Sequence, residues 1–382
     1  IAPRTMLCAT DYQDRAVQDS RGRFAELREL CSAAGDKVSL AIGMIGLAAE
    51  LKYTGRSREG ARLVSEQMAL LESIGDPTLT VGLARIAFAN WFDAGEFGEL
   101  LRWSQTVIDL AAGDPAKGAG FGIGSPLAVA LAWRGVARWW LGRPGWRQDH
   151  HDAVAMARNS DPTTLAGVVA WTYGLEIQYG VLRADDSAVR VTEEAMQTAK
   201  GASDHALSLA KYTLGVALLN LDAAADRHRG LELMVQARDM WRERVPFLVP
   251  VTEVWAARER ARRGDRDAAL AVMRQAVDEL HQAGRLGYGV WGTGVLVQTL
   301  LERGAEGDLA EAQEAFDWLA NLLDDGSAAR EITLLRLRTL LARARGDNVV
   351  YRGLVSRYRA MAESLGFEGH IAWAEAMVEG AE

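Results

Sequence analysis

Cysteine and net positive charge are both scarce in this sequence, and each scarcity excludes a class of protein. Cysteine occurs only as Cys8 and Cys31. This excludes a disulfide scaffold and a cysteine-rich metal site and suits a reducing compartment, so we expect a cytoplasmic protein. Lys and Arg number 43 against 51 Asp and Glu, giving a net charge of −8. Because phosphate neutralisation needs a basic face, we expect no nucleic-acid partner.

Long apolar runs are also missing. The longest weakly polar stretch, from Leu286 to Leu301, contains Gln298 and two threonines and lies between Arg285 and Glu302. It is too short and too polar to cross a bilayer, so we expect no membrane partner. The sequence begins with Ile, and no signal-peptide pattern follows, so we expect it to be part of a longer polypeptide. Its 49% apolar and 25% charged residues are typical of a globular protein.

Glycine followed by a charged residue recurs between helical apolar patterns. The pairs are Gly55-Arg56, Gly95-Glu96, Gly142-Arg143, Gly264-Asp265 and Gly346-Asp347. Glycine spacings from 55 to 95, from 142 to 180 and from 264 to 304 are 40, 38 and 40 residues. A repeat of this length with one tight turn inside it predicts a helical hairpin.

A second set of breaks lies half a repeat away, and three of them read Asp-Pro, at 76–77, 114–115 and 161–162. The aspartate side chain accepts hydrogen bonds from first-turn amides, and proline is tolerated at the first helical position, so each pair predicts a helix start. Between breaks, apolar residues keep the helical period. The predicted helix pairs cover residues 36–75, 76–113, 125–160, 161–201, 203–242, 248–284, 285–325 and 326–365.

The sequence therefore predicts an all-α fold, a right-handed α-solenoid of about 8–9 tetratricopeptide-like helical hairpins of ~40 residues each. Such hairpins must stack because none buries its apolar stripe alone. We expect an N-terminal helix or partial repeat at 1–35, the solenoid at 36–365 and a C-terminal capping helix at 366–382. The Gly-rich segment 114–126 interrupts the pattern. It is either a surface excursion or a lid over the concave face.

Motifs that would indicate an enzyme are absent or lack their context. Gly287, Gly289 and Gly292 fit G-x-G-x-x-G, but a dinucleotide site needs a preceding strand and a parallel sheet. We interpret them as small residues at a close helix contact. Ser208 and Lys211 fit S-x-x-K without its companion motifs. No P-loop, G-x-S-x-G, H-E-x-x-H or C-x-x-C occurs, so we predict no catalytic residue, metal or cofactor for this chain.

The histidines and an arginine-rich run offer no clear site. His150 and His151 are adjacent, which points them about 100° apart on a helix and prevents a two-point metal site. We expect the scattered others at the surface or at caps: His205, His228, His281 and His370. Arginines at 258–266 are interleaved with Glu259 and Asp265, and we interpret them as a solvated, ion-paired helix end rather than an anion site.

Tryptophan is frequent, with 12 residues against 8 Phe and 8 Tyr. Seven fall on first helices of the predicted hairpins, which line the concave face in tetratricopeptide-type stacks: Trp91, Trp133, Trp139, Trp140, Trp171, Trp255 and Trp291. One interpretation is that these indoles fill wedges between repeats. The other is a binding groove with the loop Lys117–Gly124 near its rim. The candidate groove residues are Arg85, Trp91, Trp133, Arg134, Trp171, Tyr173, Lys211, Tyr212, Glu253, Trp291 and Gln298.

Several segments resemble a known family. They are LLESIGDPTLTVGLA (70–84), LRWSQTVIDLAAGDP (101–115), GSPLAVALAWRGVARWWLG (124–142), RERARRGDRDAAL (258–270), TGVLVQTLLERGAEGD (293–308), LARARGD (341–347) and YRAMAESLGFEGHIAWAEAM (358–377). Together they are similar to the C-terminal repeat region of large mycobacterial proteins. In those proteins a class III adenylate/guanylate cyclase domain is followed by an AAA-type ATPase module and tetratricopeptide-like repeats. The resemblance covers most of the chain.

The resemblance implies a non-catalytic regulatory or sensor module of a cyclase/ATPase signalling protein. No catalytic residue carries over, because the cyclase metal ligands and the ATPase P-loop belong to upstream domains. The implied partners are a protein or peptide, the upstream cyclase and ATPase domains of the same polypeptide, or a small-molecule effector on the concave face. The alternative is a free-standing tetratricopeptide-like adaptor that only assembles other proteins.

Overall fold

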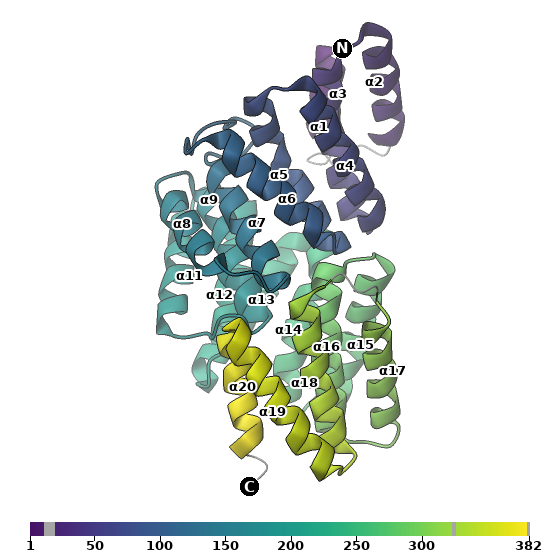
Figure 1. The fold of residues 1–382 in the computed structure, drawn as a ribbon, viewed down its shortest axis with the longest axis vertical. Helices are drawn as coiled ribbons and strands as arrows, with labels where there is room; N and C mark the ends of the chain where they lie inside the picture. The colour runs from purple at the N-terminus through teal and green to yellow at the C-terminus, as the bar shows by residue number, and fades with distance from the viewer. Residues whose placement is uncertain (11–19, 323–325, 380–382) are drawn as a thin grey trace.

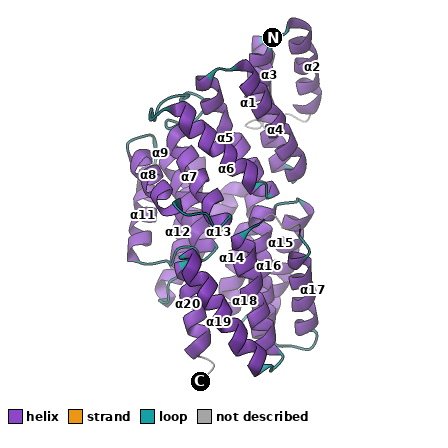
Figure 2. Ribbon diagram, in the orientation of Figure 1, coloured by secondary structure: helices purple, strands orange, loops and turns teal. Residues whose placement is uncertain are grey.

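The computed structural model describes residues 1–10, 20–322 and 326–379. These residues form helices joined by short loops, with no strand among them (Figure 1, Figure 2). The predicted all-α fold of stacked helical hairpins is therefore confirmed. No helix in this part of the chain combines the length and the apolar character that a bilayer span requires.

The chain folds into consecutive hairpins, each with a first and a second helix. The early ones are α3 (Lys37–Tyr53) with α4 (Ser57–Ile74), α5 (Pro77–Ala94) with α6 (Phe97–Ala111), α7 (Pro126–Trp140) with α8 (Trp146–Arg158), and α9 (Pro162–Val169), η2 (Ala170–Gly174) and α10 (Leu175–Gln178) with α11 (Asp186–Ala199). The later ones are α12 (Asp204–Leu219) with α13 (Ala224–Arg244), α14 (Val249–Arg262) with α15 (Arg266–Gln282), α16 (Leu286–Arg303) with α17 (Asp308–Ala320), and α18 (Ala328–Ala344) with α19 (Asn348–Leu365). A short 3₁₀ segment, η3 (Pro246–Leu248), precedes α14; α1 (Ala2–Thr10) and α2 (Ser20–Ala34) come before the hairpins, and α20 (Glu368–Glu379) follows them.

Aspartate caps start these helices as the sequence predicts, with one exception. The Asp76 side chain accepts hydrogen bonds from first-turn amides of α5, and Asp161 caps α9 in the same way. Asp114 accepts a hydrogen bond from the Ala116 amide but starts only a turn, so the helix predicted there is wrong. The physical reason lies in three glycines with positive φ, which break the helical path: Gly118, Gly120 and Gly122.

The solenoid winds tightly enough for late repeats to contact early ones. In Figure 1, α14, α16 and α18 lie below α5 and α7, and the helices in contact are α5 with α16 and α7 with α18. We call this contact between residues 52–181 and residues 245–373 the seam. Glycine turns of the early hairpins form one edge of it: Gly55 lies against Ala283, Gly95 against Leu286, Gly142 against Ala328 and Gly180 against Trp373. The predicted repeat glycines therefore serve both the turn and the inter-repeat contact.

A buried ion cluster lies within the seam. The Asp93 carboxylate on α5 is 3.2 Å from Lys52 Nζ on α3 and 3.0 Å from Arg285 Nη2 at the start of α16. Both cations also lie over the Phe247 ring of η3, at 5.0 and 4.4 Å from its centroid. Burial lowers the pKa of Lys52, and the nearby Asp93 charge opposes that shift. One carboxylate thus ties an early repeat to a late one.

The G-x-G-x-x-G residues also contribute to this packing. A Cβ on Gly287 would clash with the Phe92 carbonyl oxygen on the other side of the seam. A Cβ on Gly289 would lie 3.3 Å from the His281 ring, and Gly292 faces the same helix, α15. The interpretation of these glycines as close-contact residues is confirmed, because each meets a neighbouring helix where a dinucleotide fold would need a strand.

The start of α20 closes the seam against the α10–α11 turn. The Glu368 amide donates to the Val181 carbonyl at 2.9 Å, and the His370 amide donates to the Gly180 carbonyl at 3.0 Å. A Cβ on Gly369 would lie 2.8 Å from the Gly180 Cα, so only glycine permits this approach. The C-terminal helix is thereby hydrogen-bonded to an early repeat as well as to its neighbour α19.

Candidate ligand site on the inner helices

The tryptophans predicted to face a groove are mostly packed between repeats. Trp91 is fully buried and its Nε1 donates to Ser65 Oγ on the preceding helix at 3.0 Å. Trp133 is 2% exposed, and its ring lies 5.1 Å from that of the half-buried Trp171. Trp291 is 6% exposed. Trp91 and Trp133 therefore have no open face in this structure, because neighbouring repeats cover their rings.

The polar groove candidates lie on different helices, and those with side-chain partners have different ones. The Arg134 guanidinium pairs with Asp149 of α8 and donates to Gln105 of α6 at 2.8 Å, away from the seam. Glu253 of α14 accepts from Arg238 of α13 at 3.3 Å. The others are distributed over separate first helices: Arg85 on α5, Tyr173 in η2, Lys211 and Tyr212 on α12, and Gln298 on α16.

One small hollow does collect polar and aromatic side chains from several first helices. We call it the arginine hollow, and its lining comes from α10, α14, α16, α18 and α20: Gln178, Tyr179, Arg258, Trp291, Gly294, Val295, Gln298, Thr333, Arg336, His370 and Trp373. Its volume is about 30 Å³, room for about two water molecules. Of the predicted groove residues only Trp291 and Gln298 line it.

Two arginines give the hollow its charge. The Arg336 Nη2 donates to Gln298 Oε1, and Gln298 Nε2 donates to Glu302 Oε1 at 2.7 Å. Arg258 lies over the Trp255 ring, with its Cζ 5.4 Å from the centroid, and pairs with no carboxylate among the described residues. Burial, followed by the charges of Arg262 and Arg336, lowers the pKa of Arg258 to about 9, against the smaller opposing effects of the Glu302 and Glu259 charges. Two arginines and no carboxylate are therefore among the residues that line the hollow.

The interpretation of the arginine run as an ion-paired helix end holds for part of it only. Glu259 lies 3.0 Å from Arg263 Nε and 3.5 Å from Arg227 Nε, so the outer residues are paired as predicted. Arg258 projects instead towards the inner helices, one residue from Glu259 and on a different face of α14. Its lack of a carboxylate partner could not be predicted from α14 alone, because the hollow is also lined by residues of α18 and α20.

His370 borders the hollow as a buried, neutral ring, which corrects the expectation that it lies at the surface or at a cap. Its Nε2 lies 2.9 Å from the Tyr179 carbonyl oxygen and must donate, so its Nδ1 accepts from the Tyr358 hydroxyl at 2.7 Å. Burial and the nearby Arg336 charge lower the pKa of His370 to about 3. His150 is also buried, between Glu176 and the Ala132 carbonyl.

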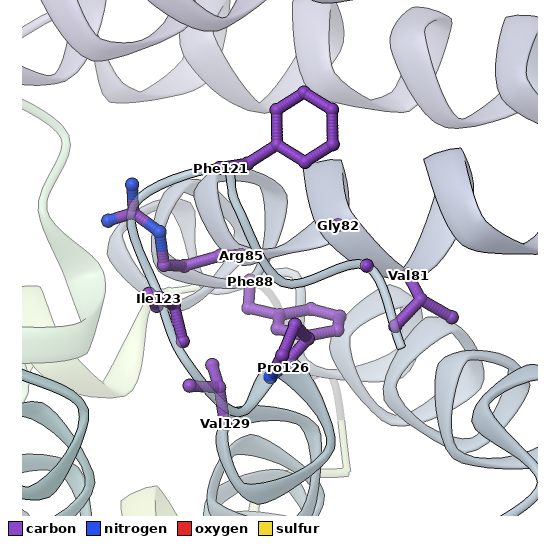
Figure 3. A pocket seen from close by; sticks show the side chains of 9 residues that line it. Val81, Gly82, Arg85, Phe88, Phe121, Ile123, Pro126 and Val129 are labelled. Carbon is purple, nitrogen blue, oxygen red and sulfur yellow. The ribbon is translucent and has the colours of Figure 1, made fainter. Parts of the chain in front are cut away.

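The Gly-rich loop packs onto α5 instead of extending from the surface. A Cβ on Gly82 would lie 2.7 Å from the Gly118 oxygen and 2.6 Å from the Phe121 ring. Figure 3 shows the loop passing over the Arg85 side chain, with Phe121 close to Gly82. The cavity beneath it is about 10 Å³, which is too small for a ligand. Most of the other loop residues are exposed, and a role as a lid over the concave face stays a prediction.

Hydrogen bonds hold both ends of this loop. Lys117 Nζ donates to the Leu110 carbonyl of α6 at 2.7 Å. The Gly124 amide donates to Asp161 Oδ2 at 2.8 Å, so the residue that caps α9 also holds the loop. Burial acts to raise the pKa of Asp161, but hydrogen bonds from the Thr164 hydroxyl and from the Thr164, Gly124 and Thr163 amides outweigh it, so this pKa lies below its usual range.

The described residues contain no group of three or more His, Cys, Asp or Glu side chains arranged to hold a metal ion. No family model matches the sequence, and no curated protein matches it. Among solved structures, the chain is similar to a Rap protein in a crystal structure of its complex with competence and sporulation factor. The match has 11% identity and a TM-score of 0.47, and it covers 90% of this chain and 98% of that one. A likeness of this degree carries no information about ligand or activity.

Proposed function

We propose that this chain is a non-catalytic helical-repeat regulatory module that binds an effector in the arginine hollow. The observation that supports it is the origin of the lining residues. Gln178 and Tyr179 belong to an early repeat, whereas Arg336 and Trp373 belong to the last helices. A ligand in the hollow would contact both sides of the seam, and its binding energy would add to the contacts that hold the two sides together.

Ligand binding in the hollow acts on the conformation of the chain through the contacts across the seam. Many groups hold the seam, among them the Asp93 cluster, the two backbone hydrogen bonds from α20 and the hydrogen bond that the Tyr179 hydroxyl donates to the Gly287 carbonyl. A ligand that binds the closed form better than an open form shifts the population by its differential affinity. We propose that this shift is the signal passed to neighbouring domains, and that those domains are a cyclase and an ATPase, as the sequence resemblance implies.

The coupling is testable without knowing the ligand. Native mass spectrometry of protein purified from a cell extract in a volatile buffer identifies a co-purified molecule, and refolding from denaturant removes it. Hydrogen exchange of the two forms is then compared over residues 366–373, which contain the Glu368 and His370 amides. We expect slower exchange in the occupied form. Equal exchange in both forms would exclude coupling between the hollow and the seam.

The alternative, a free-standing adaptor, is supported by a different surface. Val349 and Val350 are exposed at the start of α19, beside a groove of about 300 Å³ that Phe316 and Leu354 help to line. Exposed apolar residues next to a groove are typical of protein contacts. If Val349→Asp abolishes capture of a partner protein while Arg258→Gln leaves it unchanged, the adaptor function is favoured over the sensor.

A further inference from the structure

We propose that the arginine hollow is a carboxylate site, taking the head group of a small organic acid or of an acidic peptide side chain. This rests on the proposed function and names the chemistry of its effector. Neither the sequence resemblance nor the structural comparison assigns an anion site to this chain. The inference comes from unsatisfied donors, unpaired charge and aromatic walls that meet in one hollow.

The first observation is a surplus of hydrogen-bond donors. Arg336 Nε and Gln178 Nε2 are both buried and have no acceptor among the described residues. Gln178 uses its oxygen to accept from the Tyr212 hydroxyl at 2.6 Å, so its amide nitrogen remains for another acceptor. Native proteins satisfy nearly all buried polar groups. Both side chains line the arginine hollow, so an acceptor bound there would lie beside donors that the described residues leave unused.

The second observation is an arginine without a carboxylate partner, which indicates that the acceptor is an anion. Arg258 has no carboxylate partner, although its neighbours on α14 pair with Glu259. The nearby Glu302 accepts a hydrogen bond from Gln298 and is exposed to solvent. Two guanidinium groups near one hollow repel each other unless an anion lies between them. Guanidinium forks match the planar geometry of a carboxylate, which accepts two parallel hydrogen bonds.

The third observation concerns size and surroundings. The free volume of about 30 Å³ suits a compact head group, and the hollow is open on one side for the rest of the ligand. The Trp291 and Trp373 rings line it, and the Arg336 Cζ lies 4.4 Å from the Trp373 centroid. Aromatic rings beside the cations provide an apolar wall for carbon atoms next to the carboxylate.

Calorimetric titration of the whole chain tests this with defined probes: succinate, a hexaglutamate peptide, inorganic phosphate and succinamide. We expect succinate or the peptide to bind, succinamide not to bind, and affinity to fall with added salt. Binding by succinate assigns a small acid as the source, and binding by the peptide alone assigns an acidic segment. Tighter binding of phosphate, equal binding of succinamide, or no binding by either carboxylate probe would overturn the proposal.

Variants locate the binding. Arg258→Gln and Arg336→Gln should each weaken it by at least about tenfold, because each removes a charge-assisted hydrogen bond. Arg258→Lys keeps the positive charge but loses the paired N–H donors of the guanidinium group, so its affinity should lie between those of the parent and of Arg258→Gln. Arg357→Gln is the matched control, since it changes the same charge at an exposed site on α19. Unchanged affinity in Arg258→Gln overturns the assignment even if Arg336→Gln fails to fold.

The two proposals fail separately. A neutral molecule found by native mass spectrometry that slows exchange at residues 366–373 would retain the regulatory function and overturn the carboxylate chemistry. Succinate binding that depends on Arg258 but leaves that exchange unchanged would retain the carboxylate chemistry and overturn the regulatory function.

Discussion

His370 holds the start of α20 through both ring nitrogens and stays neutral where an ordinary histidine titrates. Its pKa is about 3 in the fold, against about 6.5 in an unfolded chain. Between these values the unfolded state binds a proton that the folded state does not. The free energy of unfolding must therefore fall as the pH falls below about 6.5.

The substitution His370→Gln isolates this effect, since a glutamine amide can still donate to the Tyr179 carbonyl but does not titrate. The parent should lose about 2 kcal/mol more stability than the variant between pH 6.5 and pH 4.5. Urea unfolding at the two pH values measures the difference. The same pH dependence in both proteins would show that His370 does not stay neutral in the fold.

The tryptophans provide a second residue-level prediction. Trp91→Ala and Trp133→Ala should each cost about 3–5 kcal/mol, because both rings are fully packed. Trp171→Ala serves as the internal comparison and should cost less, since Trp171 is half-buried. Denaturant unfolding of the three variants measures the costs. Small losses at Trp91 and Trp133 together with weakened ligand binding would instead favour the groove interpretation.

Among the elements, the loop between α6 and α7 depends on a single helical glycine. Gly82→Ala should cost about 1–3 kcal/mol, because the Cβ would meet the Gly118 backbone. Gly98→Ala is the matched control, since nothing lies within 4 Å of its Cβ position, and it should stabilise α6 by up to about 1 kcal/mol. Thermal unfolding of both variants checks this. Equal, small effects would mean that the loop does not pack on α5.

Helices were predictable from local signals, and their exceptions have local causes. Asp76-Pro77 and Asp161-Pro162 each start a helix, because an apolar stripe follows that can pack on neighbouring repeats. Asp114-Pro115 carries the same signal, but the glycines after it offer no such stripe and adopt positive φ. A capping signal therefore predicts a helix only when the following residues can also be buried.

At the scale of the whole molecule, the seam and the hollow could not be predicted. Whether Gln178 meets Arg336 depends on how far the solenoid rotates per repeat, summed over the hairpins between them. No local pattern encodes that sum. The sequence therefore indicated Trp291 and Gln298 from their helix but not Arg258, Arg336 or Trp373, whose common position depends on the closure of the superhelix.

Late repeats contact early ones across the seam, and residues from both sides line the hollow. Hydrogen exchange over residues 366–373 tests this arrangement most directly in two variants of α19 and α20. Gly369→Ala places a methyl group against the Gly180 backbone, whereas Gly353→Ala adds one where nothing lies within 4 Å. We predict that the Glu368 and His370 amides exchange at least about tenfold faster in Gly369→Ala and at the parent rate in Gly353→Ala. Parent-like exchange in Gly369→Ala would contradict the closure of the seam.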